Sequence, residues 1–127
     1  MILLKLILIQ KLKKKNAEYR VIKDGKFDRV EIAVNGEKRF IIGITFRKGY
    51  AHFDASIADA IYEKRIEDFE QINKIHTHFE FLRLCIKDGK IKVQTDCYFA
   101  RFSDVARCLD RIEYLHTFLL SAYHDFV

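Results

Sequence analysis

The chain has 127 residues, of which 50% are apolar and 32% are charged, and it contains no proline. This length predicts a single domain over residues 1–127, and the balance of apolar and charged residues excludes a disordered chain. The formal net charge is +5, and the first 50 residues hold 13 Lys or Arg against 5 Asp or Glu. Such a basic half can attract nucleic acid or an anionic surface, although lysines at a sheet edge also prevent aggregation.

The N-terminal run from Met1 to Ile9 is apolar, is interrupted by Lys5 and is followed by Lys11, Lys13, Lys14 and Lys15. It is far shorter than the roughly 20 residues of a membrane-spanning helix, and a secretory signal carries its charge before the apolar run. We therefore expect neither a transmembrane segment nor a signal peptide. Residues 2–15 fit either a helix or a strand packed on the domain, and the alternative is an anchor that contacts a membrane surface.

Three dipeptides mark turns: Asp24-Gly25, Asn35-Gly36 and Asp88-Gly89. Each lies between stretches in which apolar and polar residues alternate. Asn-Gly and Asp-Gly tolerate the positive φ angles that a two-residue type I′ turn requires. The three dipeptides therefore predict antiparallel hairpins.

The alternation itself predicts strands over residues 30–34 and 40–46, and Lys48-Gly49 turns the chain into a third strand over residues 50–54. Residues 19–23 are short and mixed, and they stay open between strand and loop. Strands over residues 81–86 and 91–99 flank Asp88-Gly89 and form the clearest hairpin of the chain.

Helical spacing of apolar residues predicts the remaining elements. Residues 57–65 fit the start of a helix, and residues 66–79 continue the helical spacing. Ser103 is placed to cap the last helix, whose apolar stripe contains Val105, Cys108, Leu109, Ile112, Leu115, Leu119 and Ala122. We therefore expect an α+β fold, a two-layer sandwich in which an antiparallel sheet of about five strands packs against about three helices, in the order α-β-β-β-α-β-β-α.

The three cysteines, Cys85, Cys97 and Cys108, are odd in number, and no pair has the spacing of a metal site. This favours reduced thiols and a cytoplasmic location. A link between Cys85 and Cys97 across the hairpin stays as an alternative. The five glycines are scattered, so no phosphate-binding glycine loop is present and no cofactor is expected.

Two clusters could carry chemistry. His76, His78 and Glu80 would share one face if they lay on a strand, where they could hold a divalent metal, but the helical pattern places them at a helix end. His52 and Asp54 share one strand face and could form a base with its orienting carboxylate. Residues two apart on a helix do not converge, and His52 and Asp54 have no partner at recognisable spacing, so we predict no metal site and no enzymatic activity. A metal-dependent enzyme at His76 and His78 stays as an alternative.

Two surfaces are candidates for binding. Tyr114 and Phe118 lie beside the apolar stripe of the last helix, and with Tyr50 they could contact a partner or a second copy of the chain. The basic candidates for contact with nucleic acid or another anion are Lys11, Lys13, Lys14, Lys15, Arg39 and Arg47.

The order of elements resembles the YbjN-like and type III secretion chaperone-like fold. The best stretch runs from Asp68 to Phe118 and contains DFEQINKIHTHFEFLRLCIKDGKIKVQTDCYF followed by SDVARCLDRIEYLHTF. The resemblance implies a small, non-enzymatic protein that binds a segment of another protein and often forms dimers. Secretion chaperones are typically acidic and this chain is basic, so only the fold and the binding character are carried over.

These observations predict a non-enzymatic protein-binding module, chaperone-like or a regulatory adaptor, that forms a homodimer. The alternative is a protein that binds nucleic acid or an anionic surface through its basic N-terminal half.

Overall fold

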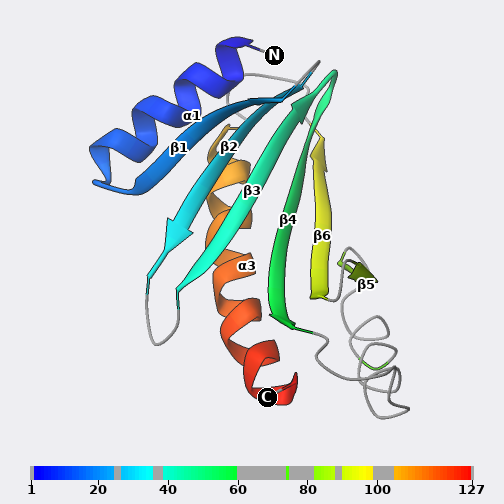
Figure 1. Ribbon diagram of the computed structural model, residues 1–127. Coiled ribbons are helices and arrows are strands. Elements are labelled where there is room, and N and C mark those ends of the chain that lie inside the picture. The colour runs from blue at the N-terminus through cyan, green and yellow to red at the C-terminus, as the bar shows by residue number, and fades with distance from the viewer. Residues whose placement is uncertain are drawn as a thin grey trace.

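The computed structural model describes eight helices and strands (Figure 1). They are α1 (Ile2–Lys14), β1 (Glu18–Asp24), β2 (Phe27–Val34), β3 (Phe40–Arg47), β4 (Tyr50–Asp59), β5 (Arg83–Lys87), β6 (Lys90–Tyr98) and α3 (Val105–Phe126). The described residues are 2–24, 27–35, 39–59, 74, 82–87, 90–98 and 105–126. No helix in these ranges is both long enough and apolar enough to cross a membrane.

The six strands form one antiparallel sheet in the order β1-β2-β3-β4-β6-β5. The first four strands follow one another as a meander, and the hairpin of β5 and β6 joins through β6. Figure 1 shows α3 behind the middle of the sheet and α1 beside β1. We call the sheet face opposite the helices the open face.

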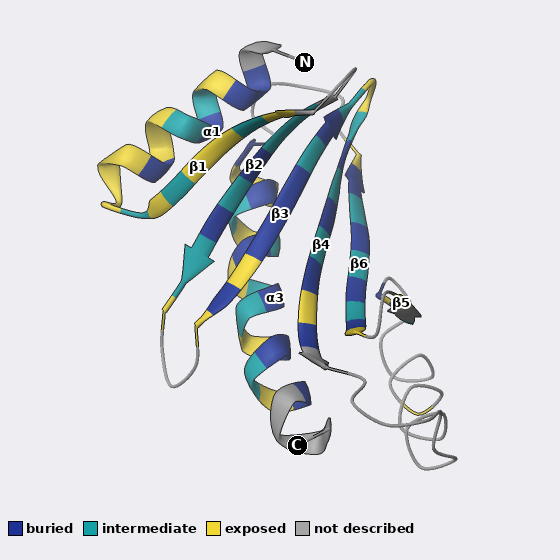
Figure 2. Ribbon diagram, in the orientation of Figure 1, coloured by how far each residue is buried: buried dark blue, intermediate teal, exposed yellow. Residues whose placement is uncertain are grey.

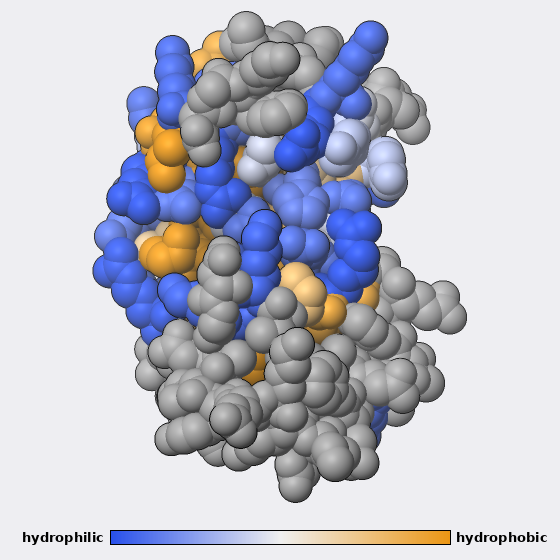
Figure 3. All heavy atoms as spheres, turned by 45° about the vertical axis from the view of Figure 1, so that its right-hand side comes forward, coloured by the Kyte–Doolittle hydropathy of each residue, from blue (hydrophilic) through white to orange (hydrophobic). Residues whose placement is uncertain are grey.

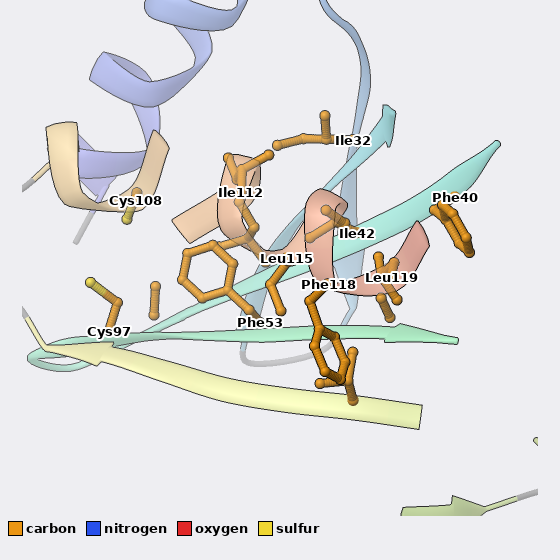
Figure 4. Close-up of a cluster of buried hydrophobic side chains, with 14 of the residues drawn as sticks. Ile32, Phe40, Ile42, Phe53, Cys97, Cys108, Ile112, Leu115, Phe118 and Leu119 are labelled. Atoms are coloured by element: carbon orange, nitrogen blue, oxygen red, sulfur yellow. The ribbon is translucent and has the colours of Figure 1, made fainter. Parts of the chain in front are cut away.

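Alternating side chains of the sheet build the core (Figure 2). Every second residue of β3 and β6 is buried, and the residues between them are more exposed apart from the buried Gly43, as expected for strands with one covered face. The apolar stripe of α3 completes the core, with Leu115 and Leu119 fully buried against Ile42 and Phe53 (Figure 4). The stripe predicted for the last helix is therefore confirmed.

Helix α1 shows why the N-terminal run is a helix and not a strand. Leu4, Leu8 and Leu12 recur every four residues and are all buried in the core. The helix ends at Lys14, and Asn16 follows it with a φ of 54°, in the left-handed region. The Asn16 N–H donates to the Lys13 carbonyl and the Ala17 N–H to the Leu12 carbonyl. This is the Schellman pattern, which satisfies carbonyls that a helix end would otherwise leave unpaired.

The predicted count of three helices and five strands is wrong, although the α+β class is confirmed. The sheet has six strands, and the described residues contain two helices. One difference is β1, a strand at the sheet edge, where the apolar Ile22 shares the open face with Arg20 and so weakens the alternation that would reveal the strand. The helix expected over residues 66–79 lies outside the described residues, apart from Lys74.

The second difference concerns Ile57 to Asp59, which continue β4 and do not begin a helix. Ala58 pairs with Ile91 and Asp59 with Lys90, after a shift of register beyond Ser56. This pairing with a distant strand outweighs the helix preference of the local sequence, which is a weak constraint by comparison.

The register tests the predicted turns. Lys87 pairs with Lys90, so the antiparallel hairpin predicted around Asp88-Gly89 is confirmed, while the two turn residues themselves lie outside the described residues. Asp24 pairs with Phe27, which puts the connection one residue later than predicted, at residues 25–26.

Val34 pairs with Phe40, so five residues join β2 to β3 and the two-residue turn at Asn35-Gly36 is wrong. A two-residue connection does occur at Lys48-Gly49, where Arg47 pairs with Tyr50. Gly49 has a φ of 83° there, which glycine adopts at low cost because it has no Cβ.

Candidate functional site

The open face carries rows of polar side chains that the register aligns across the strands. One row contains Arg20, Glu31, Gly43, Asp54, Gln94 and Arg83, one residue from each of the six strands. The next row contains Arg29, Thr45, His52 and Asp96. Because directly opposite residues on neighbouring strands point the same way, these side chains meet above one face of the sheet.

Arg29 is the centre of this arrangement. Its Nη1 and Nη2 donate to the two carboxylate oxygens of Asp54 at 2.7 and 2.9 Å. Its Nε donates to Glu31 at 3.2 Å, and Nη1 also lies 3.3 Å from the Thr45 hydroxyl. The hydrogen bonds to Asp54 are the main reason that the pKa of Arg29 is raised, and Glu31 adds to the effect, so the guanidinium remains charged.

The charges around Arg29 neutralise one another. Arg20 donates from Nε to Glu31 at 2.8 Å. This contact adds Arg20 to the network, which then consists of Arg20, Glu31, Arg29 and Asp54. Two positive and two negative groups therefore alternate. Such a network orders the face of the sheet and leaves little net charge on it.

His52 belongs to a second cluster. Its Nδ1 lies 2.7 Å from Asp96 Oδ1, and Arg83 donates to Asp96 Oδ2 at 3.2 Å. The pairing of His52 with Asp54 as a base and its carboxylate is therefore wrong, because Asp54 is bound by Arg29 and the carboxylate beside His52 comes from β6. Only the pairing of β4 with β6 brings this carboxylate into contact.

A hollow of about 460 Å³ opens above these clusters. Its described lining is Arg29, Thr45, Arg47, His52, Asp54, Lys87, Lys92 and Gln94. Figure 3 shows hydrophilic side chains gathered on this side of the molecule, with small apolar patches between them. The described lining contains no Cys or Ser, and the hydroxyl of Thr45 lies 3.3 Å from Arg29 Nη1.

The charge of the hollow follows from the pairs around it. The open face has four carboxylates whose side chains the structure describes, Glu18, Glu31, Asp54 and Asp96, and each is paired with an arginine. Lys87 and Lys92 form no ion pair with another described residue. Among the described residues, their positive charge is therefore not offset by a paired carboxylate.

An aromatic pair borders the hollow. Arg47 pairs with Tyr50 across β3 and β4, and Tyr50 pairs with Tyr98 across β4 and β6. The two tyrosine rings have centroids 5.6 Å apart and are tilted by 39°. Tyr98 is 66% exposed, so one ring of the pair is open to solvent.

The six basic residues predicted to contact anions do not form one surface. Arg47 lines the hollow, but Arg39 lies at the other end of β3, roughly 25 Å away, and donates to Glu18 at 2.8 Å. The exposed side chains of Lys11, Lys13, Lys14 and Lys15 lie at the end of α1, where Lys15 is 3.7 Å from Glu113 of α3.

The predicted partner residues are also separated. Phe118 is only 7% exposed and belongs to the core, so its side chain does not offer an outer surface for a partner. Tyr114 is half-buried on α3, and burial raises the pKa of its hydroxyl while Arg111 opposes the shift. Tyr50 lies on the open face, where it pairs with Tyr98 and with Arg47 of the hollow.

The cysteines are all free. Cys97 of β6 and Cys108 of α3 are buried and point toward one another (Figure 4). The pKa of Cys108 is raised, mainly by a hydrogen bond with Cys97 and to a smaller extent by burial. Cys85 pairs with Lys92 on the open face, whereas Cys97 faces the core, so a link between Cys85 and Cys97 is excluded.

The metal cluster considered at His76, His78 and Glu80 lies outside the described residues. In the part of the chain that the structure describes, no three His, Cys, Asp or Glu side chains are placed to hold a metal ion.

The sequence reasoning missed Lys87, Lys92, Gln94 and Tyr98 as site residues. The alternation of β6 contained a signal for three of them, because Lys92, Gln94 and Tyr98 occupy the face opposite its buried residues. No model of a protein family matches the chain, and a search of curated proteins finds no match. The resemblance to the YbjN-like and secretion chaperone-like fold stays a prediction.

Proposed function

We propose that this chain is a non-enzymatic binding module that holds an anionic partner in the hollow of its open face. The supporting observation is the difference between paired and unpaired charges. The described carboxylates around the hollow are bound by arginines, whereas Lys87 and Lys92 have no acidic partner among the described residues. An anionic ligand would supply the missing negative charge.

The contacts of the open face suit binding better than catalysis. Asp54 accepts two hydrogen bonds from Arg29, and Asp96 is held by both His52 and Arg83. A general base needs a proton to abstract within hydrogen-bond reach, and a nucleophile needs a base beside it. In this proposal the two carboxylates fix the surrounding cations, and the chain carries out no reaction.

The test measures the binding of inorganic polyphosphate by titration calorimetry at several salt concentrations. We expect binding at low salt that weakens steeply as salt is added. The double variant Lys87→Glu/Lys92→Glu should bind about ten-fold or more weakly.

The matched control is Lys13→Glu/Lys14→Glu, which changes the net charge equally at exposed positions on α1. It should bind almost as the unchanged protein does. An equal loss in both variants would show attraction by net charge alone, and an absence of binding at low salt would overturn the proposal.

A second candidate is the protein partner predicted from the sequence, bound here at a sheet edge. Among the described strands, β1 lies at one end of the sheet, and its Val21 is 43% exposed. The outer backbone groups of an edge strand can pair with a strand of another chain or of a second copy. Mass in solution, measured with and without Val21→Lys, tests this: a monomer in both cases removes the homodimer.

A further inference from the structure

We infer that the anionic partner is single-stranded nucleic acid, with phosphates in the hollow and a base stacked on Tyr98. This inference rests on the proposed function, since it names the ligand of the same hollow. Two features support it. One is the aromatic pair of Tyr50 and Tyr98 beside the cations, and the other is the length of the polar track, by which we mean the open face of β6 from Lys92 to Tyr98 together with Lys87 of β5.

The aromatic pair is placed where a base could reach it. The register puts Arg47, Tyr50 and Tyr98 side by side on three neighbouring strands, and Arg47 also lines the hollow. Tyr98 is 66% exposed while its ring is supported by Tyr50 at 5.6 Å. Rings held in this way next to cations are the stacking platforms on which single-stranded nucleic acids bind, because every base has an apolar face.

The track is too long for one small anion. Lys92 and Tyr98 lie on the same face of β6 and are six positions apart, so their backbones are roughly 20 Å apart. Gln94 and Asp96 lie between them on this face, and Lys87 extends the lining on β5. Because His52 and Arg83 bind the carboxylate of Asp96, this acidic group is already paired, and an extended backbone could place phosphates at Lys92 and Lys87 while a base reaches Tyr98.

The chemistry of the aromatic pair distinguishes this ligand from other polyanions. A duplex keeps its bases stacked on one another, so their faces are not available to Tyr98. An acidic protein segment or polyphosphate could satisfy Lys87 and Lys92, but neither has a base to stack. Dependence on the ring of Tyr98 is therefore the property to measure.

The experiment uses the full chain and a fluorescently labelled oligothymidylate of about ten nucleotides, followed by anisotropy. We expect Tyr98→Ala to weaken oligonucleotide binding by about five-fold or more. Tyr98→Phe should bind as the unchanged protein does, because the ring remains. Ile41→Ala, which also removes an exposed side chain from the open face, is the matched control.

The same variants are then titrated with inorganic polyphosphate, whose binding Tyr98→Ala should leave unchanged. If Tyr98→Ala leaves the oligonucleotide affinity unaltered, or if a duplex or poly-glutamate binds more tightly than the single strand, the inference is wrong while the proposed function stands on polyphosphate binding. If neither the oligonucleotide nor polyphosphate binds, both proposals fail. Circular dichroism spectra of the variants establish that each one is folded.

Discussion

The guanidinium of Arg29 lies in the space that a side chain at Gly43 would occupy. A Cβ added at Gly43 would overlap the guanidinium, because Arg29 crosses β3 at this point to reach Asp54 on β4. Glycine inside a strand usually weakens it, but here it opens a path for a long side chain across the sheet. The absence of a side chain at Gly43 of β3 thus allows the ion pair between Arg29 of β2 and Asp54 of β4.

The first prediction concerns this path. Gly43→Ala should lower the free energy of unfolding by about 1 to 3 kcal/mol, because the new methyl group displaces Arg29 from Asp54. Denaturation by urea measures the effect.

A double-mutant cycle provides the control. In an Arg29→Ala background the same change at Gly43 should cost much less, since no guanidinium remains to be displaced. Equal costs in both backgrounds would mean that the methyl group acts through something other than Arg29.

The second prediction concerns thiol reactivity. Cys97 and Cys108 are buried, and the raised pKa of Cys108 keeps its thiol neutral, so both should react slowly in the folded protein. Cys85 is half-buried and should be the first to be alkylated. Mass spectrometry after brief treatment with iodoacetamide identifies the labelled site, and early labelling of Cys108 would contradict its burial.

The third prediction is a dependence of stability on alkaline pH. The folded protein raises the pKa of Cys108 above its ordinary value of 9.0, so the folded state holds this proton more tightly than the unfolded state. The stabilisation is fully present below that value and is lost as the pH rises above it. Urea denaturation at neutral and alkaline pH should show this decrease.

Other groups also titrate in this range, so Cys108→Ala is the comparison. This variant is expected to lose less stability between the two pH values than the unchanged protein does. Parallel decreases in the two proteins would show that Cys108 is not the cause.

The fourth prediction concerns the end of α1. Asn16 adopts a φ of 54°, which β-branched residues strongly avoid. Asn16→Val should destabilise the protein by about 1 to 2 kcal/mol, whereas Asn16→Gly should have a small effect because glycine adopts this conformation readily. Thermal denaturation compares the two, and similar midpoints would contradict a role for the left-handed conformation.

Part of the fold could be predicted from local pattern alone. The alternation of β3 and β6 and the helical spacing of α3 each indicate one covered face, and this face is the one that the structure buries. The failures have local causes as well. β1 is an edge strand with weak alternation, and Ile57 to Asp59 carry residues that fit a helix until β6 pairs with them.

The candidate site was harder to predict, because its side chains come from strands far apart in the sequence. Arg29 meets Asp54, His52 meets Asp96, and Tyr50 meets Tyr98, each across a strand boundary. No spacing within one segment encodes such contacts. They depend on which strands are neighbours and on their register.

By itself, the sequence determined the class of the fold, the covered faces of its clearest strands and of its last helix, and an excess of positive charge. Those properties follow from the period of apolar residues and from composition, which are local or additive. Only the tertiary structure decided which carboxylates are bound by arginines. It also decided which lysines lie beside the hollow without an acidic partner among the described residues. Ion pairs depend on distance in space, and the pairing of β4 with β6 sets those distances.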